Sequence, residues 1–180
     1  MKNSFFIFLI FSLVASCNVE PRRPILRKSS SGIEQSVTLN KKIIAQQESD
    51  FNKIIKRDSL NVYIASDLGF WYTFNYKSEA SYFPKNEDEV VYSFEVYNLN
   101  YDIIYTQEEI GIRNYIVDKQ EIIEGLREGL KLMNVGDIAT FLFPSHKVFG
   151  YLGDQKKIGI NQPLIYKVQL IKINKKNESN

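Results

Sequence analysis

The ionisable side chains of this sequence form no familiar catalytic or metal-binding pattern. His146 is the only histidine among the 180 residues, which excludes a zinc site built on several histidines and leaves a catalytic triad without a supporting motif. Glu108 and Glu109 are adjacent carboxylates that could act as an acid and a base, but charge on a turn or a helix surface explains them better. We therefore expect no metal and no cofactor.

The side chains that could instead bind a substrate are apolar, and many lie between residues 119 and 174. Several recur at helical spacing and predict a short helix whose apolar face closes over a sheet: Ile122, Ile123, Leu126 and Leu130. Gly125 and Gly129 lie on neighbouring turns of this helix, where each costs about 1 kcal/mol relative to alanine. We expect close packing to be the reason for them. A turn at 134–137, a strand at 138–143, a loop at 145–162 and an alternating strand from Leu164 follow.

This order of helix, strand, glycine-containing loop and final strand resembles the C-terminal half of the FKBP-type peptidyl-prolyl isomerases. The family's motifs recur in the same order: V-I-x-G-W at 122–126, M-x-x-G at 133–136, P-x-x-x-A-Y-G at 144–150 and L-x-F-x-V-x-L at 164–170. Upstream, residues 88–94 resemble D-x-V-x-V-x-Y. The resemblance covers roughly residues 68–174. It implies an α+β fold, in which an FKBP-like curled antiparallel β-sheet wraps on one short helix and an N-terminal helix precedes it.

The resemblance also implies a pocket for a prolyl ring. Its catalytic residues would be Phe94, Ile122, Ile123, Phe149 and Tyr166, and its further substrate-binding residues would be Ile104, Tyr105, Arg113, Leu126 and Ile158. In the family, a backbone N–H at the position of Ile123 and a tyrosine hydroxyl at the position of Phe149 hold the substrate's carbonyl groups. This sequence departs from the family at Phe149, which lacks the hydroxyl. It also departs at Leu126, which replaces a tryptophan, at Tyr105, which replaces an aspartate, and at Arg113, which replaces an aromatic residue.

The chemistry implied by this resemblance needs no ionising group. Rotation about an X-Pro bond has a barrier of about 18–20 kcal/mol because twisting breaks the amide resonance. The twisted state has less charge separation than the planar one, so an apolar pocket disfavours the planar ground state. An aromatic and aliphatic cup, with a few donors for the substrate backbone, is therefore sufficient.

The N-terminal residues predict export and a lipid anchor. Residues 1–16 have one lysine near the start and an apolar run too short to span a bilayer, which predicts a signal peptide. The only cysteine, Cys17, ends a Val-Ala-Ser-Cys sequence that resembles the bacterial lipobox, so we predict its lipidation. An ordinary signal peptide with a free thiol is the alternative. Residues 17–35 would be a flexible tether, and the protein would be lipid-anchored in the cell envelope, facing the periplasm.

Two further segments complete the predicted organisation. Residues 36–60 carry an incomplete apolar stripe and predict an N-terminal helix, and residues 61–176 would be the FKBP-like domain. We expect the helix to pack on its own domain; pairing of two copies through it is the alternative. An aromatic strand at 70–76 and an alternating strand at 89–98 would contribute to the sheet.

These features leave three hypotheses for function. The first is an isomerase acting on proline-containing unfolded or envelope proteins; its layout is similar to the gliding-motility-associated FKBP-type lipoproteins of the Bacteroidota. The second is a binding module or chaperone whose catalysis is weak or absent because of Phe149, Leu126 and Tyr105. The third is a structural lipoprotein whose cup is filled by Tyr105 or Arg113. The net charge of +2 gives no reason to expect a nucleic-acid partner.

Overall fold

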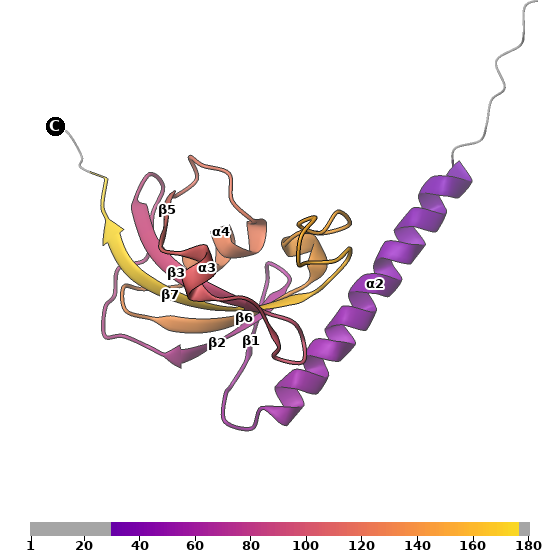
Figure 1. Cartoon of the computed structure of the whole chain (residues 1–180), viewed down its shortest axis with the longest axis horizontal. Helices are drawn as coiled ribbons and strands as arrows, with labels where there is room; N and C mark the ends of the chain where they lie inside the picture. The colour runs from indigo at the N-terminus through magenta and orange to yellow at the C-terminus, as the bar shows by residue number, and fades with distance from the viewer. Residues whose placement is uncertain (1–29, 177–180) are drawn as a thin grey trace, which may run out of the picture. The chain divides into compact units, whose positions relative to one another are not determined.

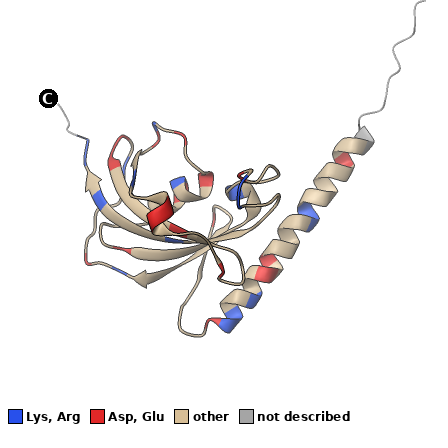
Figure 2. Cartoon of the chain, in the orientation of Figure 1, with Lys and Arg blue, Asp and Glu red and all other residues tan. Residues whose placement is uncertain are grey.

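The computed structural model describes residues 30–176, and the chain divides into two compact units, 1–36 and 37–180. The elements, in order, are α2 (Ser30–Arg57), β1 (Ile64–Ser66), β2 (Phe70–Tyr76), β3 (Glu89–Tyr97), β4 (Ile103–Tyr105), α3 (Gln107–Ile110), β5 (Arg113–Ile116), α4 (Glu124–Leu130), β6 (Ile138–Phe143), the 3-10 helix η1 (Ser145–Lys147) and β7 (Leu164–Asn174). Acidic and basic residues are interspersed along these elements (Figure 2). The sheet and the candidate site lie in the second unit.

The strands of the described region form one seven-stranded antiparallel sheet, in the order β1-β2-β6-β7-β3-β4, with β5 added to β3 (Figure 1). The register between β3 and β7 shifts at Val91/Tyr92, and that between β2 and β6 shifts between Phe74 and Tyr76. Such irregularities bend a strand and increase its twist. The sheet and the short helix α4 confirm the expected α+β fold.

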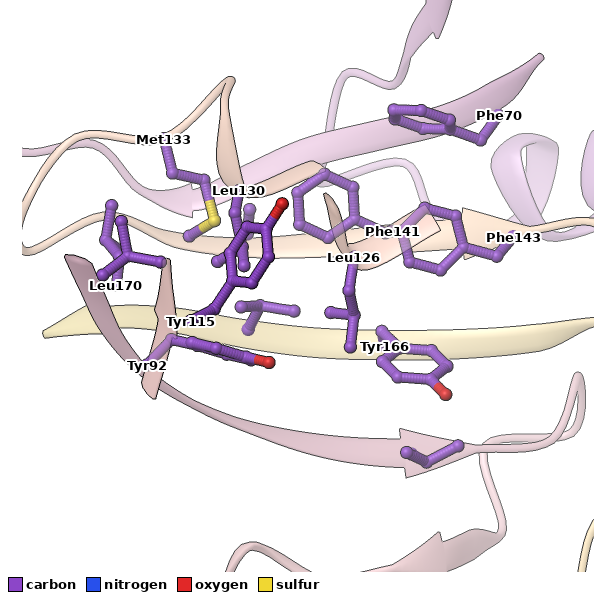
Figure 3. Packing of buried hydrophobic residues seen from close by; sticks show 14 of the residues in the cluster. Phe70, Tyr92, Tyr115, Leu126, Leu130, Met133, Phe141, Phe143, Tyr166 and Leu170 are labelled. Atoms are coloured by element: carbon purple, nitrogen blue, oxygen red, sulfur yellow. The ribbon is translucent and has the colours of Figure 1, made fainter. Parts of the chain in front are cut away.

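The core lies between the sheet and α4. Leu126 and Leu130 of the helix reach down to aromatic rings on the strands (Figure 3). The two glycines of α4 permit this approach, because a Cβ on Gly125 would lie 2.8 Å from the Phe143 ring and one on Gly129 would lie 3.0 Å from the Phe141 ring. The helical glycines therefore have the close-packing role that their cost in helix propensity predicts.

On the opposite face of the sheet, α2 packs over the end of β6 and the start of β7, while Lys167, Gln169 and Ile171 of that face are exposed. Neighbouring residues of a strand point to opposite faces of the sheet. Leu142 and Ile165 therefore point away from α4 and pack with Phe51 and Ile54 of α2. Phe51 also contacts the Trp71 ring, with 5.4 Å between the ring centroids. The expected docking of the helix on its own domain is thus confirmed, and pairing of two copies through it stays a prediction.

Both helices differ from the predicted bounds. The N-terminal helix begins at Ser30 rather than at residue 36, so the last part of the predicted tether, 30–35, is helical, and the helix ends at Arg57. Within this stretch the Ser36 hydroxyl donates to the Gly32 carbonyl oxygen at 2.9 Å, so this serine bonds to the helix itself. Ile122 and Ile123 precede α4 instead of lying in it, because Ile123 is the N-cap and has an extended ψ of 129°.

Cys17 and the predicted signal peptide lie outside the described residues. No helix within residues 30–176 combines the length and hydropathy that a membrane span requires.

Candidate active site

An open cavity of about 510 Å³ lies between α4, the curled sheet and the loop that follows η1. This volume falls within the rough range of 300–1,000 Å³ typical of small-ligand sites. Of the pocket residues predicted from the sequence, Ile104 alone does not line the cavity. The others do line it: Phe94, Tyr105, Arg113, Ile122, Ile123, Leu126, Phe149, Ile158 and Tyr166. The cavity is open with Tyr105 and Arg113 in place. The hypothesis that either side chain fills it is therefore wrong.

The inner wall of the cavity is aromatic and belongs to the core. Tyr166 of β7 stacks on Phe94 of β3, with 5.4 Å between ring centroids, and meets Phe143 edge-on at 5.5 Å. Leu126 of α4, only 3% exposed, completes this surface. These side chains form an apolar surface of fixed shape on this wall of the cavity.

Two hydrogen-bond donors accompany the apolar wall. Ile123 lines the cavity, and its N–H donates to no residue of the described chain, because the first N–H groups of a helix lack intrahelical acceptors. The Tyr166 hydroxyl likewise has no hydrogen-bond partner within residues 30–176. It is not fully buried, so it is accessible from the cavity that Tyr166 lines. Burial raises the pKa of Tyr166, and burial raises that of the neighbouring Tyr92 to about 12, so both phenols stay protonated at neutral pH.

The outer wall is a loop held by polar contacts. Asp154 accepts a hydrogen bond from the Tyr105 hydroxyl at 2.5 Å and two more from the backbone N–H groups of Lys156 and Ile158. Lys157 pairs with Glu109 at 2.5 Å, but both side chains are nearly half exposed, so this ion pair contributes little. The loop is thereby joined to β4, and Phe149 and Ile158 are brought to the cavity.

The charge state of Asp154 follows from these contacts. Burial by itself would raise the pKa of Asp154, but the hydrogen bonds from Tyr105 and from the backbone outweigh it and hold the pKa below its usual value. The same hydrogen bond raises the pKa of Tyr105. The pair therefore keeps one geometry, phenol donating to carboxylate, throughout the neutral range.

Several lining residues were not predicted from the sequence: Tyr92, Val96, Glu109, Ile110, Asp154 and Lys156. Tyr92 and Val96 share the alternating face of β3 with Phe94, so that alternation could have identified them. Asp154 comes to the site through a contact with a residue 49 positions away, for which the sequence carries no local signal. Within residues 30–176, no three His, Cys, Asp or Glu side chains gather as a metal site would require.

A solved peptidyl-prolyl cis-trans isomerase shares this fold. The crystal structure of the enzyme from Pseudomonas syringae pv. tomato matches with a TM-score of 0.60, covering 75% of this chain and 96% of that chain. The two sequences are 15% identical, so this likeness concerns the fold alone.

The sequence itself matches the FKBP-type peptidyl-prolyl cis-trans isomerase family over residues 80–171, which are 92 of the 180 residues. A stretch of 53 residues is 40% identical to a probable FKBP-type peptidyl-prolyl cis-trans isomerase, FkpA, from Neisseria meningitidis serogroup B. That match covers 29% of this chain and 20% of the relative's length. The chain belongs to the FKBP-type peptidyl-prolyl cis-trans isomerase family.

Proposed function

We propose that this protein catalyses cis-trans isomerisation of X-Pro bonds in unfolded polypeptides, without a covalent intermediate or a cofactor. The observation that carries this proposal is the open cavity in which Phe94, Tyr166 and Leu126 meet. A prolyl ring seated on these side chains would have its amide in an apolar environment, which favours the twisted state over the charge-separated planar one. Ile123 N–H would hold a substrate carbonyl group during the rotation.

The missing hydroxyl at Phe149 has a counterpart elsewhere in the cavity. The family's closing motif has phenylalanine where this chain has Tyr166, and the Tyr166 phenol lines the cavity without a protein partner in the described region. We assign to it the role of second donor to the substrate. A neutral hydrogen bond contributes roughly 0.5–1.5 kcal/mol, so this donor accounts for about a two- to tenfold effect on rate.

A peptide isomerisation assay tests this function. The purified protein should accelerate relaxation of a proline-containing test peptide, and Tyr166→Phe should lower kcat/KM by about two- to tenfold. Phe149→Tyr in the Tyr166→Phe background should recover part of the loss by placing a hydroxyl on the other wall. Tyr97→Phe is the matched control, because Tyr97 lies outside the cavity and also loses one hydroxyl.

The second candidate function is a binding module without turnover, and the absence of a hydroxyl at Phe149 favours it. The same assay separates the two. Unchanged relaxation at every enzyme concentration, together with saturable binding of an unfolded proline-containing protein, would reject catalysis and support the module.

We further propose that the protein acts in the cell envelope on secreted or envelope clients, such as components of gliding machinery, while anchored by a lipid on Cys17. The lipobox-like sequence before Cys17 supports this location. Metabolic labelling with a fatty-acid analogue should mark the wild-type chain and not Cys17→Ser. Labelling of both, or of neither, would contradict the anchor.

A further inference from the structure

We propose that Gln47 of α2 is a positioning residue for the prolyl cavity, acting from outside it through the loop that forms the outer wall. This proposal rests on the proposed isomerase function and extends it to a helix that precedes the matched family region of 80–171. Gln47 is a buried polar side chain, 4% exposed, on the face of α2 that packs against the domain.

The amide of Gln47 joins the two ends of the loop. Its Nε2 donates to the Ser145 Oγ and to the Asn161 carbonyl oxygen, both at 2.9 Å. Its Oε1 accepts from the Ser145 N–H at 2.9 Å and from the Ser145 Oγ at 3.2 Å. The amide group of Gln47 thus connects Ser145 and Asn161, which are 16 residues apart in sequence (161 minus 145).

Both ends of the loop are in turn hydrogen-bonded to Gly150, the residue that follows the cavity-lining Phe149. Gly150 N–H donates to the Ser145 carbonyl oxygen, and Asn161 N–H donates to the Gly150 carbonyl oxygen, both at 2.8 Å. Gly150 has a φ of 57° and Asn161 a φ of 50°, so the loop depends on left-handed residues at both points. A continuous series of hydrogen bonds therefore runs from Gln47 to the neighbour of Phe149.

Helix docking alone does not require this glutamine. Phe51 and Ile54, four and seven positions later on the same face, already pack with Leu142 and Ile165. An apolar residue at position 47 would preserve that packing but remove the Gln47 partner of the Ser145 N–H, which is buried, and of the Asn161 carbonyl oxygen, which is partly buried. A glutamine side chain satisfies both groups, because its Oε1 accepts from the Ser145 N–H and its Nε2 donates to the Asn161 carbonyl oxygen.

Isomerisation kinetics and amide hydrogen exchange on the full-length protein test this proposal. Gln47→Leu should lower kcat/KM by about tenfold, which corresponds to ~1.4 kcal/mol. It should also speed exchange in residues 148–161 while α4 keeps its protection. Gln47→Glu, which retains the acceptor for Ser145 N–H but loses the donor to Asn161, should fall between wild type and Gln47→Leu. Gln46→Leu is the matched control, because Gln46 is exposed and, within residues 30–176, its side chain bonds only to Asp50.

Each outcome decides the proposal. Wild-type kinetics in Gln47→Leu, or exchange that rises equally in the loop and α4, would overturn it. If Gln47→Leu does not fold, the same two readouts are taken from Gln47→Glu. If the wild-type protein accelerates no peptide, the proposed isomerase function fails. Exchange confined to residues 148–161, with weaker binding of the peptide by the Gln47 variants, would then still support positioning of the cavity.

Discussion

The two walls of the cavity are built in different ways. Tyr166 and Leu126 on the inner wall are 1% and 3% exposed and are fixed by ring contacts and by a helix packed on the sheet. The outer wall is a loop in which Ile158 is buried and the other residues are partly buried or exposed, and it is joined to its surroundings by bonds of Asp154 and Gln47. Packing of the inner wall also stabilises the whole domain, whereas the bonds of the outer wall mainly fix a local conformation. Stability and activity should therefore respond differently to changes on the two walls.

The largest effect is expected from the inner wall. Leu126→Ala removes buried methyl groups beneath α4 and should lower the free energy of unfolding by about 2–5 kcal/mol, together with the activity. Urea denaturation measures this loss. Leu152→Ala, at a position 69% exposed, should change stability by less than about 0.5 kcal/mol. Equal effects of the two leucine substitutions would contradict the difference between the walls.

A smaller effect that is confined to activity is expected from the outer wall. Tyr105→Phe removes the hydroxyl that donates to Asp154 and should lower kcat/KM by about two- to tenfold, with little change in the urea midpoint. Tyr97→Phe removes a matched hydroxyl-to-carboxylate bond, that of Tyr97 to Glu95 at 2.5 Å, away from the cavity. If both variants lose activity to the same extent, the Tyr105–Asp154 bond has no special role.

The smallest effect is expected from pH. The pKa of Asp154 lies below its usual value of 3.8 in the folded state, and the pKa values of Tyr105 and Tyr166 lie above their usual value of 10.0. The kcat/KM should therefore be flat between about pH 5 and about pH 9. A depressed carboxyl pKa contributes stability above the unfolded pKa, so the contribution of Asp154 is lost as pH falls through its folded pKa, below 3.8. An activity midpoint near neutral pH would indicate an ionising group that this site does not use.

The sequence predicted apolar residues on both walls of the cavity but not the polar contacts that hold the outer wall, for a physical reason. The family resemblance placed Phe94, Leu126 and Tyr166 in the pocket, and alternation in the strands and helical spacing agree with it, because they report burial of a residue by its own element. Ile123 was found as a site residue but placed in the helix, because an N-cap residue contributes to the same apolar face as the helix that follows it. Ile104 does not line the cavity, although it packs on the same core as Phe94 and Ile122, which do.

The polar contacts of the outer wall could not be predicted in this way. Gln47 and Ser145 are 98 positions apart, and Tyr105 and Asp154 are 49 apart. Such pairs are chosen by the folded geometry, and neither member has a distinctive neighbourhood in the sequence. The alignment in fact counted Tyr105 as a departure from the family, whereas the structure shows its hydroxyl anchoring the loop.

The position of β7 has a consequence for biosynthesis. The last strand of the described region lies between β6 and β3 in the middle of the sheet, so neither half of the sheet has its central partner until residues 164–174 have been made. Pairings this distant in sequence close slowly and expose unpaired strand edges in the meantime. A nascent chain halted before β7 should therefore remain protease-sensitive, and a protein proposed to assist the folding of others would itself fold only after its own β7 has been made.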